Sequence, residues 1–123
     1  MKCCKFFFTI FTLCIISINS VAATVVCSGT VDALAYHGNN KLMVKLSSMN
    51  APVFFCSPEF EWAPTGTTYK TGPETCKTLY STFLAAKMSG KTINSMYFDG
   101  DQVPATCSSW GNWKQANIRY FSL

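Results

Sequence analysis

The chain has 123 residues, of which 49% are hydrophobic and 13% are charged, and its formal net charge at pH 7 is +4. Its basic residues are spread along the sequence without a polybasic run, and this argues against a nucleic-acid-binding protein, which gathers basic side chains into a face or stripe. Because the sequence contains no internal repeat and no linker, we expect one domain.

The first 23 residues have the three parts of a cleavable secretory signal. Lys2 and Lys5 give the positive start, residues 6–18 form an apolar stretch, and Val21-Ala22-Ala23 offers a small-residue cleavage site. A transmembrane helix needs roughly 20 predominantly apolar residues, more than this stretch supplies. We therefore expect residues 1–23 to be a signal peptide and the rest to be a soluble protein, secreted or periplasmic, without a stable membrane anchor.

Four cysteines follow the signal, and an even number in a small exported chain predicts two structural disulfides formed in an oxidising compartment. Their spacing matches no zinc-binding pattern, so no metal site and no cofactor is expected. Three pairings are open, and stability alone does not choose among them, because the entropy of loop closure changes slowly with loop length. The four residues are Cys27, Cys56, Cys76 and Cys107.

The first half of the mature chain is predicted to form three strands. Val25–Tyr36 is rich in β-branched residues, and Lys41–Leu46 places Leu42, Val44 and Leu46 on one face. The polar segment 37–40 between them predicts a hairpin turn. A third strand is expected at Val53–Cys56, because Pro52 suits the entrance of a strand. These strands would form a meander.

A long loop and a helix are expected next. Residues 57–72 contain prolines, glycines and threonines and follow neither helical nor strand periodicity. Thr71 and Glu74 have the spacing of a capping box, Pro73 suits the first helical turn, and Gly90 stands where a C-cap glycine is expected. Apolar residues recur at helical spacing between these ends and predict one buried stripe. They are Cys76, Leu79, Tyr80, Phe83, Leu84 and Met88.

Two strands are predicted to complete the chain. Lys91–Phe98 forms the fourth strand, 99–101 a turn, and Gln115–Leu123 the last strand. The order β-β-β-α-β-β is that of an OB-like five-stranded barrel, in which a helix often lies between the third and fourth strands. We therefore predict a mostly-β α+β fold, with residues 24–123 forming a single OB-like domain held by disulfides.

No catalytic pattern is found in the sequence. The only histidine, His37, lies in a predicted turn, and Glu59 and Glu61 flank Phe60 in the long loop, where nothing would shift the pKa of either carboxyl. Asp99-Gly100-Asp101 lacks the remaining ligands of a calcium loop. A non-enzymatic protein is therefore expected. A small hydrolase stays an alternative, because folding can bring distant residues together.

Four aromatic residues in predicted loops are the candidate ligand-binding residues. Trp62 and Tyr69 lie in the long loop, and Trp110 and Trp113 lie in a segment rich in serine and asparagine. Such rings can stack on a sugar while neighbouring amides and hydroxyls bind its hydroxyl groups. The alternative is that the rings plug the open ends of a small barrel.

Two short segments carry a resemblance to known proteins. The segment 84–93, LAAKMSGKTI, resembles the helix-to-strand junction of the B subunits of AB5 bacterial toxins, and Cys27-Ser28-Gly29 resembles the opening strand of a group of small exported bacterial proteins. The resemblance to toxin B subunits implies a ring-shaped pentamer that binds cell-surface glycans and delivers a separate catalytic chain. The chain departs from the cholera-type pattern, because it has four mature cysteines rather than one pair.

The barrel layout also favours one disulfide pairing. If Cys27 opens the first strand and Cys107 lies near the last, the two strands are neighbours in a closed barrel, so a bridge between them is expected. Cys56 and Cys76 would then tie the third strand to the helix and close the long loop.

The sequence thus predicts an exported binding protein whose partner is a cell-surface glycan, and the resemblance to toxin B subunits implies a homo-oligomer. The alternative is a secreted or periplasmic protein-interaction or inhibitor domain with a defined protein partner. No nucleic acid is expected to bind.

Overall fold

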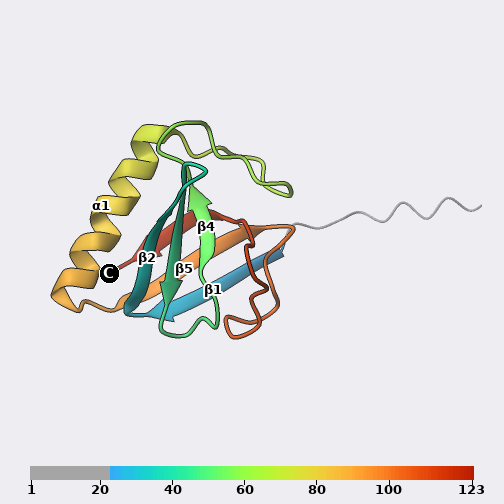
Figure 1. The fold of residues 1–123 in the computed structure, drawn as a ribbon. Helices are drawn as coiled ribbons and strands as arrows, with labels where there is room; N and C mark the ends of the chain where they lie inside the picture. Colours follow the sequence, from blue (N-terminus) through green and yellow to red (C-terminus); the bar gives the residue numbers. More distant parts are fainter. Residues whose placement is uncertain (1–22) are drawn as a thin grey trace, which may run out of the picture.

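A computed structural model describes residues 23–123 (Figure 1), so all of the predicted signal peptide except Ala23 lies outside the described residues. The described chain forms six strands and one helix, where five strands were predicted. They are β1 (Ala23–Gly29), β2 (Val31–His37), β3 (Lys41–Leu46), β4 (Val53–Cys56), α1 (Pro73–Ser89), β5 (Ile93–Gly100) and β6 (Asn117–Ser122).

The strands form two antiparallel sheets of three strands each, in the orders β1-β5-β6 and β2-β3-β4. Figure 1 shows α1 along one side of the sheets and the long loop after β4 over one end of them. The predicted mostly-β fold with a single helix is confirmed. The predicted closed five-stranded barrel is wrong, because the two sheets are separate and do not close on each other.

The extra strand arises because the predicted strand Val25–Tyr36 is broken at Thr30. The preceding Gly29 has φ +124°, a conformation that side-chain-bearing residues rarely adopt, and a Cβ there would overlap the Ser47 hydroxyl. That hydroxyl accepts a hydrogen bond from the Thr30 N–H at 3.2 Å. The chain therefore changes sheets at this point: β1 pairs with β5, whereas β2 pairs with β3.

The two sheets meet at Phe54 in β4. Its N–H donates to the Lys114 carbonyl at 2.9 Å, and its carbonyl accepts from the Ala116 N–H at 3.0 Å. These bonds form an isolated parallel bridge between Phe54 and Gln115, just before β6 begins. One edge of β2-β3-β4 is thereby fastened to the segment that leads into the other sheet.

The core lies between the inner faces of the two sheets and is covered at one side by α1. Phe83 of the helix packs edge-on against Phe55 of β4, with ring centroids 5.5 Å apart, and against Phe121 of β6 at 5.0 Å. Phe55 and Phe83 are fully buried, as is Phe98 of β5. The helix thus contacts both sheets through one aromatic side chain.

The ends of the helix match the sequence in part. Gly90 is in the left-handed conformation at φ 67° and closes the C-terminus through its N–H, as predicted. The predicted capping box is wrong, because the N-cap residue is Gly72 and makes no side-chain cap. The Thr71 hydroxyl donates to the Asn117 side chain instead, at 3.1 Å.

The buried stripe of the helix is narrower than predicted. Cys76, Phe83 and Ala86 are buried, whereas Leu84 and Met88 are 39% and 80% exposed. Successive helical residues are rotated by about 100°, so Leu84 points away when its neighbour Phe83 faces the core. The helix is therefore held by a few contacts near its inner face.

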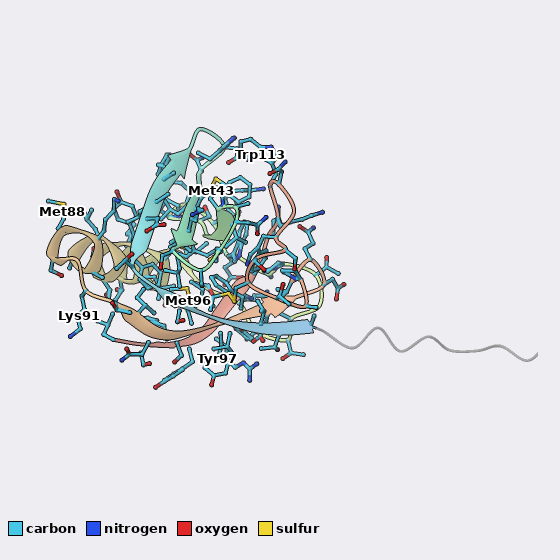
Figure 2. The ribbon with its side chains drawn as sticks, turned by 90° about the horizontal axis from the view of Figure 1, so that it is seen from below. Met43, Met88, Lys91, Met96, Tyr97 and Trp113 are labelled. Atoms are coloured by element: carbon cyan, nitrogen blue, oxygen red, sulfur yellow. A yellow bond between two sulfur atoms is a disulfide. The ribbon has the colours of Figure 1, made fainter. Side chains whose placement is uncertain are left out.

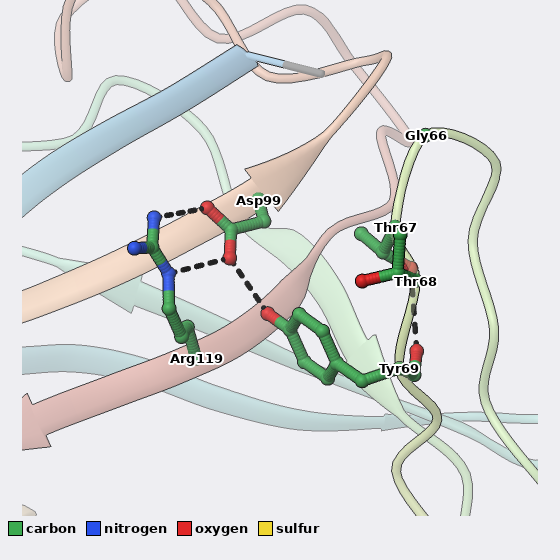
Figure 3. A pocket seen from close by; sticks show the side chains of 6 residues that line it. All are labelled: Gly66, Thr67, Thr68, Tyr69, Asp99 and Arg119. Atoms are coloured by element: carbon green, nitrogen blue, oxygen red, sulfur yellow. Dashed lines mark hydrogen bonds and ion pairs between the residues drawn. The ribbon is translucent and has the colours of Figure 1, made fainter.

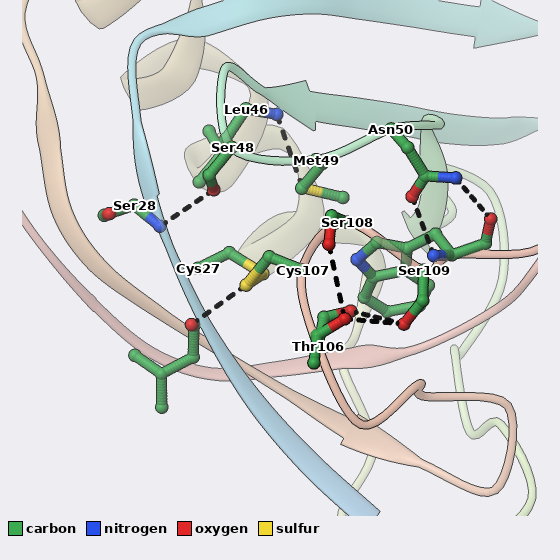
Figure 4. The surroundings of a disulfide bond; sticks show 12 residues. Cys27, Ser28, Leu46, Ser48, Met49, Asn50, Thr106, Cys107, Ser108 and Ser109 are labelled. Carbon is green, nitrogen blue, oxygen red and sulfur yellow. Dashed lines mark hydrogen bonds between the residues drawn. A yellow bond between two sulfur atoms is a disulfide. The ribbon is translucent and has the colours of Figure 1, made fainter.

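Both disulfides link segments that are distant in sequence. Cys56 is bonded to Cys76, which ties β4 to α1, and Cys27 is bonded to Cys107, which ties β1 to the loop between β5 and β6 (Figure 4). This is the pairing that the barrel layout favours. Each such bond typically contributes about 2–4 kcal/mol to the stability of a small domain.

The long loop after β4 is ordered by polar contacts rather than by regular structure. Trp62 and Thr71 exchange two backbone hydrogen bonds of 2.9 Å. The buried Asn117 side chain donates to the Thr67 hydroxyl at 2.9 Å and to the Tyr69 carbonyl at 3.0 Å. Thr65 accepts from the Asp101 N–H at 3.0 Å. The loop is therefore fixed against the ends of β5 and β6.

Gly66 is predicted to be required where the long loop approaches Asp101, at the end of β5. It has φ +90°, and a Cβ on it would stand 2.7 Å from the Asp101 nitrogen. We expect Gly66→Ala to lower the free energy of unfolding by about 1–3 kcal/mol, measured by chemical denaturation. Gly38→Ala is the control, because a Cβ there meets nothing within 4 Å. Equal effects of the two substitutions would contradict the close approach.

Candidate functional site

The structure separates the four predicted aromatic residues into two buried rings and two accessible ones. Trp62 and Trp110 are each only 3% exposed, so neither presents a ring face to a ligand. Trp113 is 63% exposed, and Tyr69 is half-buried at the edge of a pocket. Trp62 and Trp110 therefore fill the interior of the protein and are not accessible to a ligand.

The two buried tryptophans differ in how their indole N–H groups are satisfied. The Trp62 Nε1–H donates to the Ala116 carbonyl at 2.9 Å. Trp110 packs edge-on against Phe98, with ring centroids 5.3 Å apart, but its buried Nε1–H has no partner among the described residues. The backbone of Trp110 is instead held by Asn50, whose side chain bonds both its N–H and its carbonyl (Figure 4).

Trp113 belongs to a cluster of three rings on the outer side of β2-β3-β4, which we call the aromatic platform (His37, Phe54 and Trp113). The Trp113 ring lies 5.3 Å from His37, edge-on, and 6.1 Å from Phe54, nearly parallel. His37 and Phe54 are themselves 5.5 Å apart. Sequence analysis assigned His37 only to a turn and missed Phe54, because strand pairing brings them together.

Polar and cationic groups border the platform. Lys41 Nζ lies 5.5 Å from the centre of the Phe54 ring, within the range of a cation–π contact. A cavity of about 330 Å³ beside it is lined by Met43, Pro52, Asn112 and Trp113. Figure 2 shows Trp113 and Met43 close together at one side of the molecule, far from Tyr97.

The backbone of Trp113 is strained. Its φ is +59°, in the left-handed region that a bulky side chain rarely occupies. The next residue, Lys114, is fastened to Phe54, and Cys107 and Trp110 anchor the earlier part of the loop through the disulfide and Asn50. The surrounding contacts thus hold the exposed ring in place at a cost in backbone energy, a pattern found often at binding sites.

A second candidate site is a pocket of about 530 Å³ at the end of β5 (Figure 3). Its polar centre is Asp99, which binds the guanidinium of Arg119 through Nε and Nη2, both at 2.8 Å. The Tyr69 hydroxyl donates to the same carboxylate at 2.8 Å, and so does the Thr24 hydroxyl. Gly66, Thr67 and Thr68 complete the lining.

The charges of this pocket are fixed by its hydrogen bonds. Burial raises the pKa of the Asp99 carboxyl, but hydrogen bonds from Arg119, Thr24 and Tyr69 outweigh burial and hold that pKa below its ordinary value. Burial and the bond to Asp99 raise the pKa of the Tyr69 hydroxyl. At neutral pH, the pocket therefore contains a carboxylate, a guanidinium and a neutral phenol.

Sequence analysis named Tyr69 but missed Asp99 and Arg119. Asp99 was assigned to a turn, whereas it lies in β5 opposite Thr24. The available signal was that Arg119, the only arginine in the chain, follows a strand pattern that would place it on a sheet surface.

The structure also places the three residues that the sequence offered for chemistry. His37 Nδ1 contacts the Asn39 side chain at 2.8 Å, and the His37 ring also packs edge-on against Phe54 and Trp113. Glu59 is exposed, and Glu61 forms an exposed ion pair with Lys70 at 3.2 Å. Within residues 23–123, no three histidine, cysteine, aspartate or glutamate side chains gather into a metal-binding group. In the same range, no helix is long and apolar enough to span a membrane.

Comparison of the chain with protein-family models, with curated proteins and with solved structures gives no match.

The buried tryptophans are predicted to respond differently to replacement by phenylalanine. Trp62→Phe leaves the Ala116 carbonyl without its donor, whereas Trp110→Phe removes an N–H that is already unpaired. We expect Trp62→Phe to lower the free energy of unfolding by about 1–3 kcal/mol more than Trp110→Phe, measured by chemical denaturation. Equal losses would mean that the bond to Ala116 contributes nothing.

Acid is predicted to weaken the fold through Asp99. Because the pKa of its carboxyl is lower in the folded state, its stabilising effect is complete above the ordinary pKa of about 3.9 and is lost as pH falls through the folded-state pKa. We expect Asp99→Asn to lower the free energy of unfolding at neutral pH by about 1–3 kcal/mol. The same substitution should make the free energy of unfolding depend less on pH below the ordinary carboxyl pKa. Urea denaturation across pH measures both effects.

Glu59→Gln is the control for this experiment, because the Glu59 side chain is exposed. If Glu59→Gln and Asp99→Asn changed the acid dependence equally, the ion pair between Asp99 and Arg119 would not be the cause.

Proposed function

We propose that this chain is an exported, non-enzymatic binding protein that takes a glycan on the aromatic platform. The observation that carries the proposal is Trp113, a residue that is 63% exposed although its backbone is held in a strained left-handed conformation. A solvent-exposed indole contributes little to folding, so the strain is better explained by a ligand that contacts the ring.

The chemistry of the platform suits a sugar. The broad face of Trp113 offers an apolar surface for the C–H groups of a pyranose ring, and His37 and Phe54 support it from below. The Asn112 amide and the Lys41 ammonium lie beside these rings and can bind hydroxyl groups. An apolar surface bordered by a few polar groups is the usual composition of a small-ligand site.

The architecture supports the same location, and we propose that the fold is an opened OB-like barrel. β1 and β2 together correspond to the long first strand of such a barrel, and the bridge at Phe54 corresponds to its parallel closure. OB domains bind oligosaccharides and oligonucleotides on the face of their second and third strands and on the adjoining loops. In this chain, those elements are β3, β4, the turn after His37 and the loop that contains Trp113.

Export is part of the proposal. The two disulfides in a chain of this size are typical of proteins that fold in an oxidising compartment, either the periplasm or the extracellular space. The signal-like sequence of residues 1–23 is the expected route to it.

Replacing Trp113 is predicted to remove binding without loss of stability. We expect Trp113→Asn to abolish binding on a printed glycan array, because the stacking surface is lost. Asparagine tolerates the left-handed conformation, so the free energy of unfolding should stay within about 1 kcal/mol of the original value or rise. Chemical denaturation and glycan-array binding are both measured on the same preparation of each protein.

Tyr120→Ala is the matched control, because Tyr120 is 57% exposed but lies on β6 of the other sheet. Unchanged binding by Trp113→Asn would exclude the platform. A specific protein partner captured only by the original chain, with an empty glycan array, would favour the protein-interaction alternative.

A further inference from the structure

We propose that the ligand of the aromatic platform is an oligosaccharide of three or more residues, which extends from Trp113 past Lys41 to a second aromatic contact at Phe60. The proposal rests on the proposed function in taking a glycan as the ligand, and it names the class of glycan. Three observations support it: a second cavity on the same face of the sheet, an exposed aromatic ring beside that cavity, and an ammonium group with free donors between the two cavities.

Two cavities open on the outer face of β2-β3-β4. The cavity beside the platform, of about 330 Å³, is lined in part by Met43 and Trp113, and a second cavity of about 310 Å³ is lined in part by Lys41 and Phe60. Met43 and Lys41 are two residues apart on β3, so their side chains lie on the same face of that strand, whereas Leu42 between them is buried in the core. The cavities therefore lie along one surface.

The size of the cavities favours a chain of sugars over a single sugar. Each volume is at the lower end of the range for small-ligand sites, which suits one sugar residue. The two cavities share no lining residue, so one monosaccharide fills only one of them. Phe54 connects them, because Trp113 stacks on its ring at 6.1 Å and Lys41 Nζ lies 5.5 Å from its centre. A ligand that contacts both cavities must therefore be a chain that crosses Lys41.

Phe60 is the aromatic contact of the second cavity. Phe60 is 42% exposed, although a fully buried residue fixes the turn that carries it. The Ser57 hydroxyl accepts hydrogen bonds from the Glu59 and Phe60 N–H groups, at 3.1 and 3.3 Å. The buried Trp62 ring supports Phe60 from one side, with ring centroids 6.5 Å apart. An exposed ring in an ordered turn offers an apolar surface to the C–H groups of a second sugar.

Lys41 supplies free donors between the two cavities. Its Nζ lies 5.5 Å from the centres of both the Phe54 and the Trp62 rings, which hold the ammonium group by cation–π contacts. Within residues 23–123, this ammonium group forms no ion pair, and Glu61, the carboxylate at the same cavity, is paired with Lys70 at 3.2 Å. The three N–H donors of Lys41 are therefore available to sugar hydroxyl groups.

The dependence of binding on glycan length tests the proposal. The probe is a glycan array printed with series of one to six residues of each glycan, and a series of protein concentrations gives the half-saturating concentration for each member. We expect binding to the oxidised original chain to strengthen with length up to at least three residues, because only a chain of this length reaches from Trp113 to Phe60.

Two substitutions at Phe60 test the second contact itself. Phe60→Leu removes the aromatic face and should raise the half-saturating concentration for members of three or more residues by about fivefold to tenfold, without changing the binding of one-residue members. Phe60→Tyr keeps the ring and should bind as the original chain does. Leu84→Ala is the matched control, because Leu84 is a 39% exposed apolar residue on α1. The thermal midpoint reports whether each variant is folded.

The proposal is overturned if one-residue members bind the original chain as tightly as the longest members do, if Phe60→Leu keeps the full gain with length, or if Phe60→Tyr loses that gain as well. Its failure is distinguishable from that of the platform. Loss of binding in Trp113→Asn together with an unchanged length dependence in Phe60→Leu would reject only the contact at Phe60. An array on which the original chain binds nothing would reject the platform and the extended site with it.

Discussion

The pair of backbone hydrogen bonds at Phe54 fixes the position of the segment that leads into β6, and both candidate sites depend on that segment. They hold residues 114–116 against β4, and the residues on either side then take their positions in order. Trp113 is placed over the Phe54 ring, the Ala116 carbonyl receives the Trp62 indole, Asn117 fastens the long loop, and Arg119 reaches Asp99. One short segment therefore positions both candidate sites.

Different physical interactions hold the two candidate sites in place. At the platform, the strain of the Trp113 backbone is offset by the disulfide at Cys107 and by the contacts of its loop with Asn50 and Phe54. At the pocket, the Asp99 carboxylate is buried and ion-paired with Arg119, whose side chain stays half-exposed. Both arrangements hold an exposed side chain in one conformation.

Local patterns in the sequence predicted most of the secondary structure. The spacing of Leu42, Val44 and Leu46 identified β3, Pro52 marked the entrance of β4, and Gly90 marked the end of α1. The errors have specific causes. The break between β1 and β2 depends on Gly29 and on its contact with Ser47, eighteen residues away. The capping box failed because Asn117, a residue of the last strand, binds the Thr71 hydroxyl.

The sequence by itself determined the approximate places of the helix and of the five predicted strands, because local periodicity and turn residues depend on neighbours in the chain. It also showed an even number of cysteines after the predicted signal. Only the tertiary structure decided which aromatic rings are accessible. Trp110 and Trp113 lie in the same loop, yet Trp110 is buried and its backbone is hydrogen-bonded to Asn50. Trp113 packs against Phe54 and stays exposed. The pairing of Asp99 with Arg119 arises in the same way, from strand register and not from sequence spacing.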